Sequence, residues 1–224
     1  MSFVVAIDGP AGSGKGTLTA EISKITDLIN IDTGATYRCV TLAAIRRGYT
    51  LEDEEKIINL LDEINIELRK VDGEDKFFLD GEDVSKKIRE KEVTQMVSYV
   101  SGITGVRIKM SEFQRRLAQG KNVIMEGRDI GTYVFPNADV KIYLDASLEI
   151  RAARRVRQNK EKNIDMSYEE VFENMKKRDY NDMHGKEIGA LKKAKDAIYL
   201  DCSDMSVEEM TNKVLEIINE KRNK

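Results

Sequence analysis

The sequence has no tryptophan, one histidine, two cysteines and two prolines. The single histidine, His184, excludes a metal site built from several histidines and leaves little support for a Ser-His-Asp triad, so we expect it in a solvated loop. Cys39 and Cys202 lack the spacing of a metal or redox motif. We therefore expect two reduced thiols, no protein-held metal and a cytoplasmic location.

The sequence also lacks an excess of basic charge and any long apolar run. Its formal net charge of −3 gives no electrostatic footprint for a nucleic-acid polymer. No apolar run approaches the about 18 residues of a membrane span, and the N-terminal residues have the pattern of a strand rather than of a signal peptide. We expect neither nucleic acid nor membrane as a partner, and nothing in the pattern suggests an obligate dimer, so a monomer is expected.

The strongest motif lies close to the N-terminus. A β-branched apolar run over residues 4–8 predicts a buried strand, and helical spacing follows from Lys15 to Ile25. Glycines between them allow the backbone to curl so that its N–H groups face an anion at the helix N-terminus. This is the pattern of a phosphate-binding loop, in which a lysine reaches the β- and γ-phosphates. The nucleotide-binding residues expected from it are Gly9, Pro10, Ala11, Gly12, Ser13, Gly14, Lys15, Gly16 and Thr17.

The match to G-x-x-x-x-G-K-[ST] is incomplete. Gly16 occupies the hydroxyl position, and the hydroxyl follows one residue later at Thr17. The Lys-Gly-Thr ending is the variant found in small-molecule nucleotide kinases, and it leaves direct ligation of Mg²⁺ by the threonine in doubt.

Strands and helices alternate along most of the chain. Further strands are predicted at 28–32, 123–126, 140–145 and 197–201, and helices at 37–47, 148–160, 167–179 and 207–221, the last with Ser206 as its N-cap. This alternation predicts a parallel sheet covered by helices on both faces. Residues 63–92 break the rhythm: strands at 64–71 and 76–79 flank Asp-Gly-Glu-Asp and predict a small antiparallel insert.

Several arginine-bearing motifs lie at predicted strand ends or on helices. Arg38 follows the strand at 28–32 after a sharp turn that Gly34 permits, and Arg128-Asp129 follows the strand at 123–126. The carboxyl ends of strands in an open α/β sheet meet at the ligand-binding edge, and an arginine there can bind a phosphate bidentately. The alternatives are a surface arginine at Arg38 and a structural ion pair at Arg128-Asp129.

A third group of arginines lies on the predicted helix at 148–160. Arg151, Arg154 and Arg155 share one face of it. Uncompensated like charge favours an anionic ligand there, although a solvated helix is an equal alternative. The polar residues 159–165, at the end of this helix, are interpreted either as a solvated turn or as a lid that closes over the phosphates. Arg178-Asp179 and Asp182 repeat an arginine–carboxylate grouping.

These motifs, in this order, resemble bacterial cytidylate kinases. The resemblance covers about residues 3–217 and is most specific at Glu-Gly-Arg-Asp-Ile-Gly-Thr with Val-Phe-Pro, residues 126–132 and 134–136. It implies a P-loop nucleotide kinase of the α/β class, with a parallel sheet flanked by helices, an NMP-binding insert and a lid. Residues 1–36 and 97–224 would form the core with a lid at about 154–166, and 37–96 the NMP-binding domain. It further implies ATP, Mg²⁺ and phosphoryl transfer to CMP or dCMP.

The resemblance also implies residue roles. Ser98, Arg107 and Asp129 would read the cytosine. Arg38 and Arg128 would hold the acceptor phosphate, with Tyr37 and Thr33 beside them. Arg178 and Asp182 would approach the ribose. Arg128 and the lid arginines Arg154 and Arg155, together with Lys15, would neutralise the transferring phosphate.

The chain departs from the family at three places. Lys186 stands where an arginine is usual, the spacing through Met183-His184-Gly185 is one residue longer, and Thr36 replaces a larger apolar residue. We assign Lys186 to substrate binding. A broader UMP/CMP kinase or another small-metabolite P-loop kinase is the alternative among enzymes. A GTPase-like switch is disfavoured because Asn159-Lys160-Glu161-Lys162 lacks the acid of a guanine-reading Asn-Lys-x-Asp motif.

Overall fold

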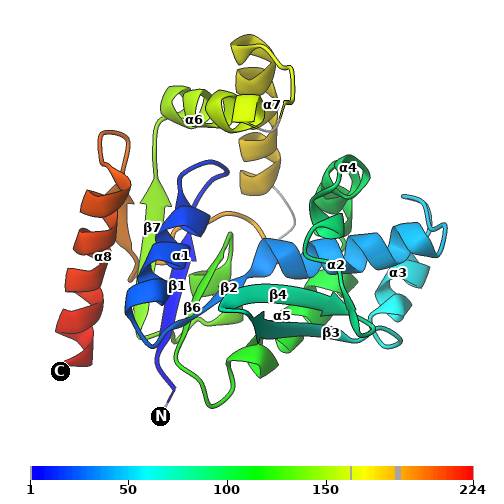
Figure 1. The fold of residues 1–224 in the computed structure, drawn as a ribbon, viewed down its shortest axis with the longest axis horizontal. Helices are drawn as coiled ribbons and strands as arrows, with labels where there is room; N and C mark the ends of the chain where they lie inside the picture. Colours follow the sequence, from blue (N-terminus) through cyan, green and yellow to red (C-terminus); the bar gives the residue numbers. More distant parts are fainter. Residues whose placement is uncertain (1, 162, 185–187, 224) are drawn as a thin grey trace. The chain divides into compact units, whose positions relative to one another are not determined.

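A computed structural model describes residues 2–161, 163–184 and 188–223. The chain divides into two compact units, residues 1–31 with 118–224 and residues 32–117 (Figure 1). The second unit extends beyond the predicted 37–96 segment at both ends, because residues such as Ala35, Val100 and Met110 belong to its apolar core. That residues 37–96 bind the monophosphate stays a prediction.

The first unit is built on a five-stranded sheet with strand order β2-β6-β1-β7-β8. β1 pairs in parallel with β6 and β7, and β7 with β8. β1 is buried at every residue, as expected for a central strand rich in β-branched residues. The predicted parallel sheet is confirmed. The strands are β1 (Val4–Asp8), β2 (Ile29–Asp32), β6 (Val123–Gly127), β7 (Val140–Asp145) and β8 (Ile198–Asp201).

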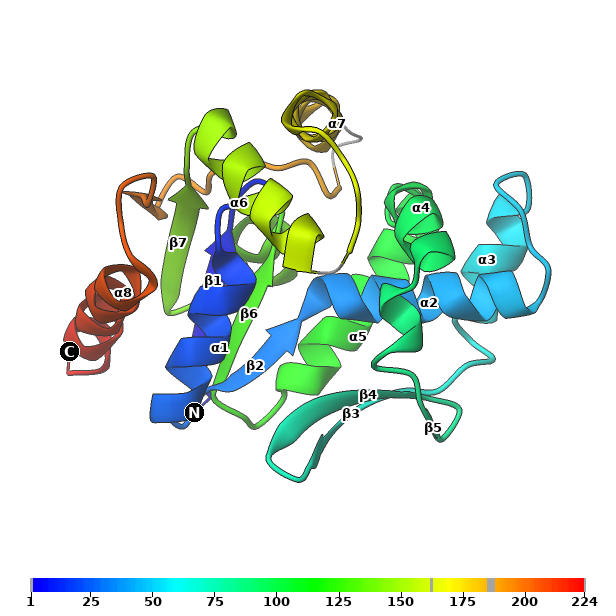
Figure 2. The same cartoon turned by 45° about the horizontal axis from the view of Figure 1, so that its top comes forward.

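Helices pack against this sheet and against each other. α1 (Lys15–Ile25) and α8 (Val207–Arg222) lie side by side and bury Leu18, Ile22 and Val214 in the core of this unit (Figure 2). α6 (Leu148–Glu161) and α7 (Tyr168–Met183) pack together around a smaller apolar cluster. α7 and α8 each begin with a Ser-x-x-Glu capping box, which satisfies backbone N–H groups that the first helical turn leaves open.

The second unit combines helices with a three-stranded antiparallel sheet, β3-β4-β5. The predicted hairpin is confirmed, but its turn is Asp72-Gly73, with positive φ at both residues, rather than four residues. The elements of this unit are α2 (Thr33–Arg46), α3 (Glu54–Leu60), β3 (Ile66–Val71), β4 (Glu74–Leu79), β5 (Glu82–Asp83), the 3₁₀ turn η1 (Lys87–Arg89), α4 (Lys91–Val100) and α5 (Thr104–Ala118).

Two helix boundaries differ by four residues from those predicted: α7 continues to Met183 instead of ending at 179, and α2 starts early. α2 begins at Thr33 and not at 37, because the Asp32 carboxylate caps it by accepting from Ala35 N at 2.9 Å. Gly34 therefore lies in the first helical turn and does not form a sharp turn. The segment after β6 is likewise ordered: Ile130–Val134 forms one π-helical turn, η2.

Candidate active site

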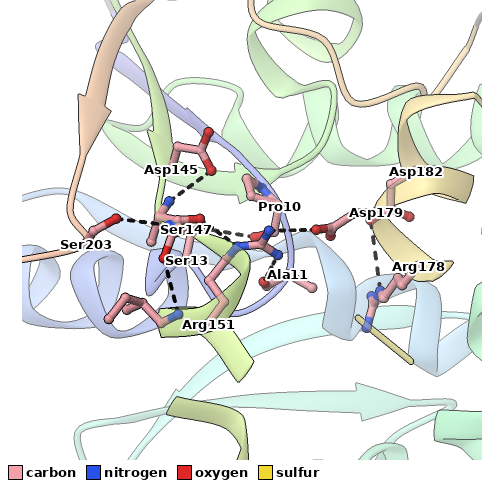
Figure 3. Close-up of polar contacts among 12 residues, drawn as sticks. Pro10, Ala11, Ser13, Asp145, Ser147, Arg151, Arg178, Asp179, Asp182 and Ser203 are labelled. Carbon is pink, nitrogen blue, oxygen red and sulfur yellow. Dashed lines mark hydrogen bonds and ion pairs between the residues drawn. The ribbon is translucent and has the colours of Figure 1, made fainter. Parts of the chain in front are cut away.

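The phosphate-binding loop joins β1 to α1 as predicted (Figure 3). Gly9, Gly12 and Gly14 have φ values of 154°, 76° and 100°, which residues other than glycine rarely adopt. A Cβ on Gly9 would lie 2.0 Å from the carbonyl oxygen of Leu144 in β7, so the loop passes directly over the neighbouring strand. Glycine is therefore required here both for backbone conformation and for space.

Lys15, the first residue of α1, is buried. Its ammonium donates to the carbonyl of Pro10 at 2.7 Å and lies 3.3 Å from Ser13 Oγ. Burial and the guanidinium of Arg128 lower the pKa of Lys15 to about 7, against the opposing carboxylates of Glu126 and Asp8. The amine thus folds back onto its own loop.

A side chain at Gly16 would meet the end of a neighbouring glutamate. A Cβ on Gly16 would meet the Glu126 carboxylate oxygen at 2.8 Å. Glu126 belongs to β6, the strand next to β1, and would have to move to admit a serine or threonine. The threonine that follows, Thr17, is exposed in the first turn of α1. The sequence analysis assigned Glu126 no role. The position of Glu126 at the end of a predicted strand is the signal that could have placed it near the loop.

A buried carboxylate fixes the loop after β6. The two oxygens of Asp8 accept from the backbone N–H groups of Ile130 at 2.8 Å and Gly131 at 2.7 Å. Burial raises the pKa of Asp8 to about 6, although these two hydrogen bonds oppose the shift. Asp129, the predicted base reader, precedes this anchored segment and is itself buried.

The predicted substrate residues of the first unit form a charged network. Arg128 Nε donates to Asp182 Oδ2 at 2.8 Å, and Arg178 Nε lies 3.9 Å from the same oxygen (Figure 3 shows the latter pair). Arg128 comes from the end of β6 and the other two from α7. The structure thus brings together residues that are far apart in the sequence.

The three arginines of α6 differ in their surroundings. Arg154 donates to the carbonyl of Cys202 at 2.8 Å and to that of Ser13 at 3.4 Å, next to the phosphate loop. Arg155 is half-buried and contacts Gln158 on its own helix. Arg151, to which the sequence assigned no specific role, is buried and forms an ion pair with Asp179 of α7 at 2.7 Å (Figure 3). Helical spacing placed the three on one face but did not reveal this partner.

In the second unit, Tyr37 and Arg107 lie together. The guanidinium carbon of Arg107 is 5.4 Å from the centre of the Tyr37 ring, and Arg107 Nη1 donates to the carbonyl of Ser101 at 2.9 Å. Ser98 lies nearby in sequence, exposed on α4. Arg38 on α2 donates to the carbonyl of Ile88 and to the Thr94 hydroxyl.

The polar residue Thr36 fits the interior of the second unit. It is fully buried, donates to the carbonyl of Thr33 at 2.7 Å and accepts from Gln114 Nε2 at 3.3 Å. Thr33 is buried as well. The hydroxyl is therefore satisfied by a partner on α5, which explains how threonine replaces a larger apolar residue.

Lys186 lies outside the described residues. Within the described ranges, no group of three or more His, Cys, Asp or Glu side chains is arranged to hold a metal ion, and no helix has the length and apolar character needed to cross a membrane. Both cysteines are free thiols and buried.

Known proteins match this sequence over almost its whole length. The family model of cytidylate kinase matches residues 5–220. The cytidylate kinase of Caldicellulosiruptor bescii is 46% identical over 213 residues, which is 95% of this chain and 94% of the relative. That of Caldanaerobacter subterraneus subsp. tengcongensis is 46% identical over 218 residues, 97% and 95% of the two chains.

Solved structures show the same fold at low sequence identity. Shikimate kinase from Bacteroides thetaiotaomicron has a TM-score of 0.50 and 11% identity, covering 97% of this chain and 98% of its own. TT1252 from Thermus thermophilus has a TM-score of 0.50 and 17% identity, with coverage of 98% and 97%. The fold is that of the P-loop kinases, and the chain belongs to the cytidylate kinase family.

Proposed function

We propose that this protein is a cytidylate kinase, which transfers the γ-phosphoryl group of ATP to CMP or dCMP and yields ADP with CDP or dCDP. The observation that carries the proposal is the composition of the first unit. It holds a phosphate loop with its lysine and, from β6 and α7, the network of Arg128, Arg178 and Asp182. Membership of the family and the names of its relatives support the same reaction.

On the donor side, residues 9–17 would bind the ATP phosphates through backbone N–H groups and Lys15. The ammonium has three N–H donors, of which one contacts the carbonyl of Pro10, so another would donate to a phosphate oxygen. Arg154 and Arg155 would neutralise charge that develops on the transferring group, and Arg154 is already held at the loop by Ser13. The acceptor phosphate is an anion and is itself the nucleophile, so no strong general base is needed.

Mg²⁺ would neutralise the ATP phosphates and is proposed to be held chiefly by them and by water. Thr17, exposed at the start of α1, and Glu126, beside Gly16, offer the hard oxygen atoms that suit this ion. The described residues add no cluster of acidic side chains beyond these.

On the acceptor side, we assign roles within each unit separately. In the first unit, Arg128 would bind the CMP phosphate, Asp129 the exocyclic amine of cytosine, and Arg178 with Asp182 the ribose. In the second unit, Arg38, Tyr37 and Thr33 would serve the phosphate, and Ser98 and Arg107 the base. Lys186 is assigned to the phosphate by its place in the family motif. We further propose that the protein acts as a cytoplasmic monomer, and its mass in solution tests the oligomeric state.

The test is a coupled assay of ADP release with ATP, Mg²⁺ and one acceptor at a time: CMP, dCMP, UMP, AMP or GMP. CMP and dCMP should exceed AMP and GMP strongly. UMP should trail by about tenfold or more, because it leaves a buried polar group unpaired at a cost of about 1–3 kcal/mol. Similar rates with UMP would support the broader UMP/CMP kinase, and activity with none of these acceptors would refute the proposal.

A further inference from the structure

The buried ion pair of Arg151 and Asp179 joins three segments of the first unit. Arg151 Nε donates to the carbonyl of Ala146 at 2.8 Å, one terminal nitrogen donates to the carbonyl of Ala11 at 3.1 Å, and the other contacts Asp179 Oδ2 at 2.7 Å. These partners belong to the β7–α6 connection, the phosphate loop and α7 (Figure 3). The side chains of the pair are only 6% and 12% exposed.

Packing around the pair reinforces the same connection. A Cβ on Gly12 would lie 2.9 Å from the terminal methyl of Met175 on α7 and 3.4 Å from Cβ of Arg151. The tip of the phosphate loop therefore lies directly against α6 and α7. A change in the position of α7 would be transmitted to the loop through these contacts.

The connection continues to the other end of the site. Asp182 lies nearly one helical turn beyond Asp179 on α7 and holds Arg128 at 2.8 Å. Side-chain contacts thus join Ala11 to Asp179 through Arg151, and the backbone of α7 joins Asp179 to Asp182 and its partner Arg128. It joins residues proposed for the donor to residues proposed for the acceptor.

The chemistry of the pair favours a role in geometry over one in stability. A buried ion pair is often no more stable than apolar side chains of the same volume. Asp179 Oδ1 is buried and, among the described residues, has no hydrogen-bond partner, so the pair is incompletely compensated. A guanidinium can direct three nitrogens at three fixed acceptors, which the single ammonium of lysine cannot do.

We propose that Arg151 and Asp179 are positioning residues that set the distance and angle between the phosphate loop and the acceptor-binding face of α7. This rests on the proposed function, because the loop and α7 are assigned there to ATP and CMP. Neither residue touches a substrate in this proposal. Their effect is on the alignment of the two phosphates for in-line transfer.

The test compares Arg151→Lys with Arg157→Lys, a matched change at an exposed position of the same helix. Misplacement by about 1 Å can cost roughly 100-fold in rate. Arg151→Lys should therefore lower kcat by roughly 10- to 100-fold at saturating ATP and CMP, and each KM should change less than kcat. The assay is run well below the melting temperature of every variant. A folded Arg151→Lys protein with kcat within twofold of the wild type overturns the proposal.

A kinetic cycle separates positioning from a purely structural role. Arg151→Lys is combined with Asp182→Asn, and the two losses in kcat should be clearly less than multiplicative, because both act on one aligned geometry. Multiplicative losses would overturn the proposal. If Arg151→Lys does not fold, Arg151→Met with Asp179→Leu replaces both buried charges by apolar groups. That double variant should fold and lose kcat to a similar extent. A normal kcat would overturn the proposal, and failure to fold would assign the pair to structure alone.

Failure of the proposed function would be visible separately. The wild type and Arg157→Lys would then both fail to phosphorylate CMP, and the same comparison would be made with whichever acceptor the wild type uses. A loss of kcat confined to Arg151→Lys supports the positioning role. Lack of activity with CMP in the wild type and both variants shows instead that CMP is not the acceptor.

Discussion

Replacing Lys15 by methionine should make the protein more stable while abolishing turnover. Lys15 is buried at the start of α1, and its pKa falls from the usual 10.5 to about 7 through burial and the proximity of Arg128. Methionine has a similar length and no charge. The same feature that would hold a phosphate therefore costs folding free energy in the nucleotide-free protein.

The magnitude follows from the pKa. At about 1.36 kcal/mol for each pKa unit, the fall from 10.5 to about 7 makes the protonated amine about 5 kcal/mol less favourable in the folded protein than in the unfolded chain. Methionine also gives up the hydrogen bond to the carbonyl of Pro10, worth about 1.5–3 kcal/mol, while the longer contact to Ser13 adds little. The carbonyl of Pro10 keeps a donor, Ser13 Oγ at 3.1 Å. The net gain is about 2–3.5 kcal/mol, or roughly 4–14 °C in Tm for a chain of this size.

Urea denaturation and thermal unfolding without nucleotide, at pH 7, measure this gain. Because the unfolded chain binds a proton that the folded protein lacks between about pH 7 and 10.5, wild-type stability rises with pH there. The advantage of Lys15→Met should shrink accordingly and be lost near pH 10.5. The coupled assay should show a loss of roughly 100-fold or more in kcat. A variant that is less stable than the wild type at pH 7 would refute this reasoning.

Three further changes test other parts of the site. Asp129→Asn should weaken CMP as an acceptor by about tenfold more than UMP, since only cytosine offers an amine to the carboxylate; equal losses of kcat/KM for both would make Asp129 structural. Lys186→Ala should raise KM for CMP or lower kcat, and Lys186→Arg should preserve activity because arginine also binds phosphate; unchanged kinetics of the alanine variant would make Lys186 a bystander. Between about pH 4 and 6, folded Asp8 holds a proton that the unfolded chain has lost. As the pH rises through this range, the unfolding free energy of the wild type should therefore fall by up to about 3 kcal/mol relative to that of Asp8→Asn. Parallel urea-denaturation profiles of the two proteins across that range would contradict the assignment.

The β1–loop–α1 segment was predictable to the residue because its signals are local. A β-branched run, glycines with positive φ and a helical pattern each act within a few residues of one another. The hairpin around Asp72-Gly73 was found for the same reason. The start of α2 was missed because Gly34 suggested a turn, whereas the cap from Asp32 outweighs the low helix propensity of one glycine.

Features that depend on distant partners were not predictable from spacing. Arg151 had the same pattern as Arg154 and Arg155, and only the packing of α7 distinguishes it. The closeness of the Glu126 carboxylate to Gly16 follows only from the pairing of β6 with β1. The helices α3, α4 and α5 were not expected, since their apolar residues meet only in the core of the second unit.

The strand order has a consequence for the order in which the chain folds. β1 carries the phosphate loop, yet both of its neighbours, β6 and β7, begin only at Val123 and Val140. The second unit is one continuous stretch, residues 32–117, with its own core and local hairpin. During synthesis from the N-terminus, that unit can fold before β1 is paired. β1 can pair only after β6 and β7 have left the ribosome, and strand pairing over a long loop is slow. β1 is thus made before the second unit and yet reaches its native environment after it.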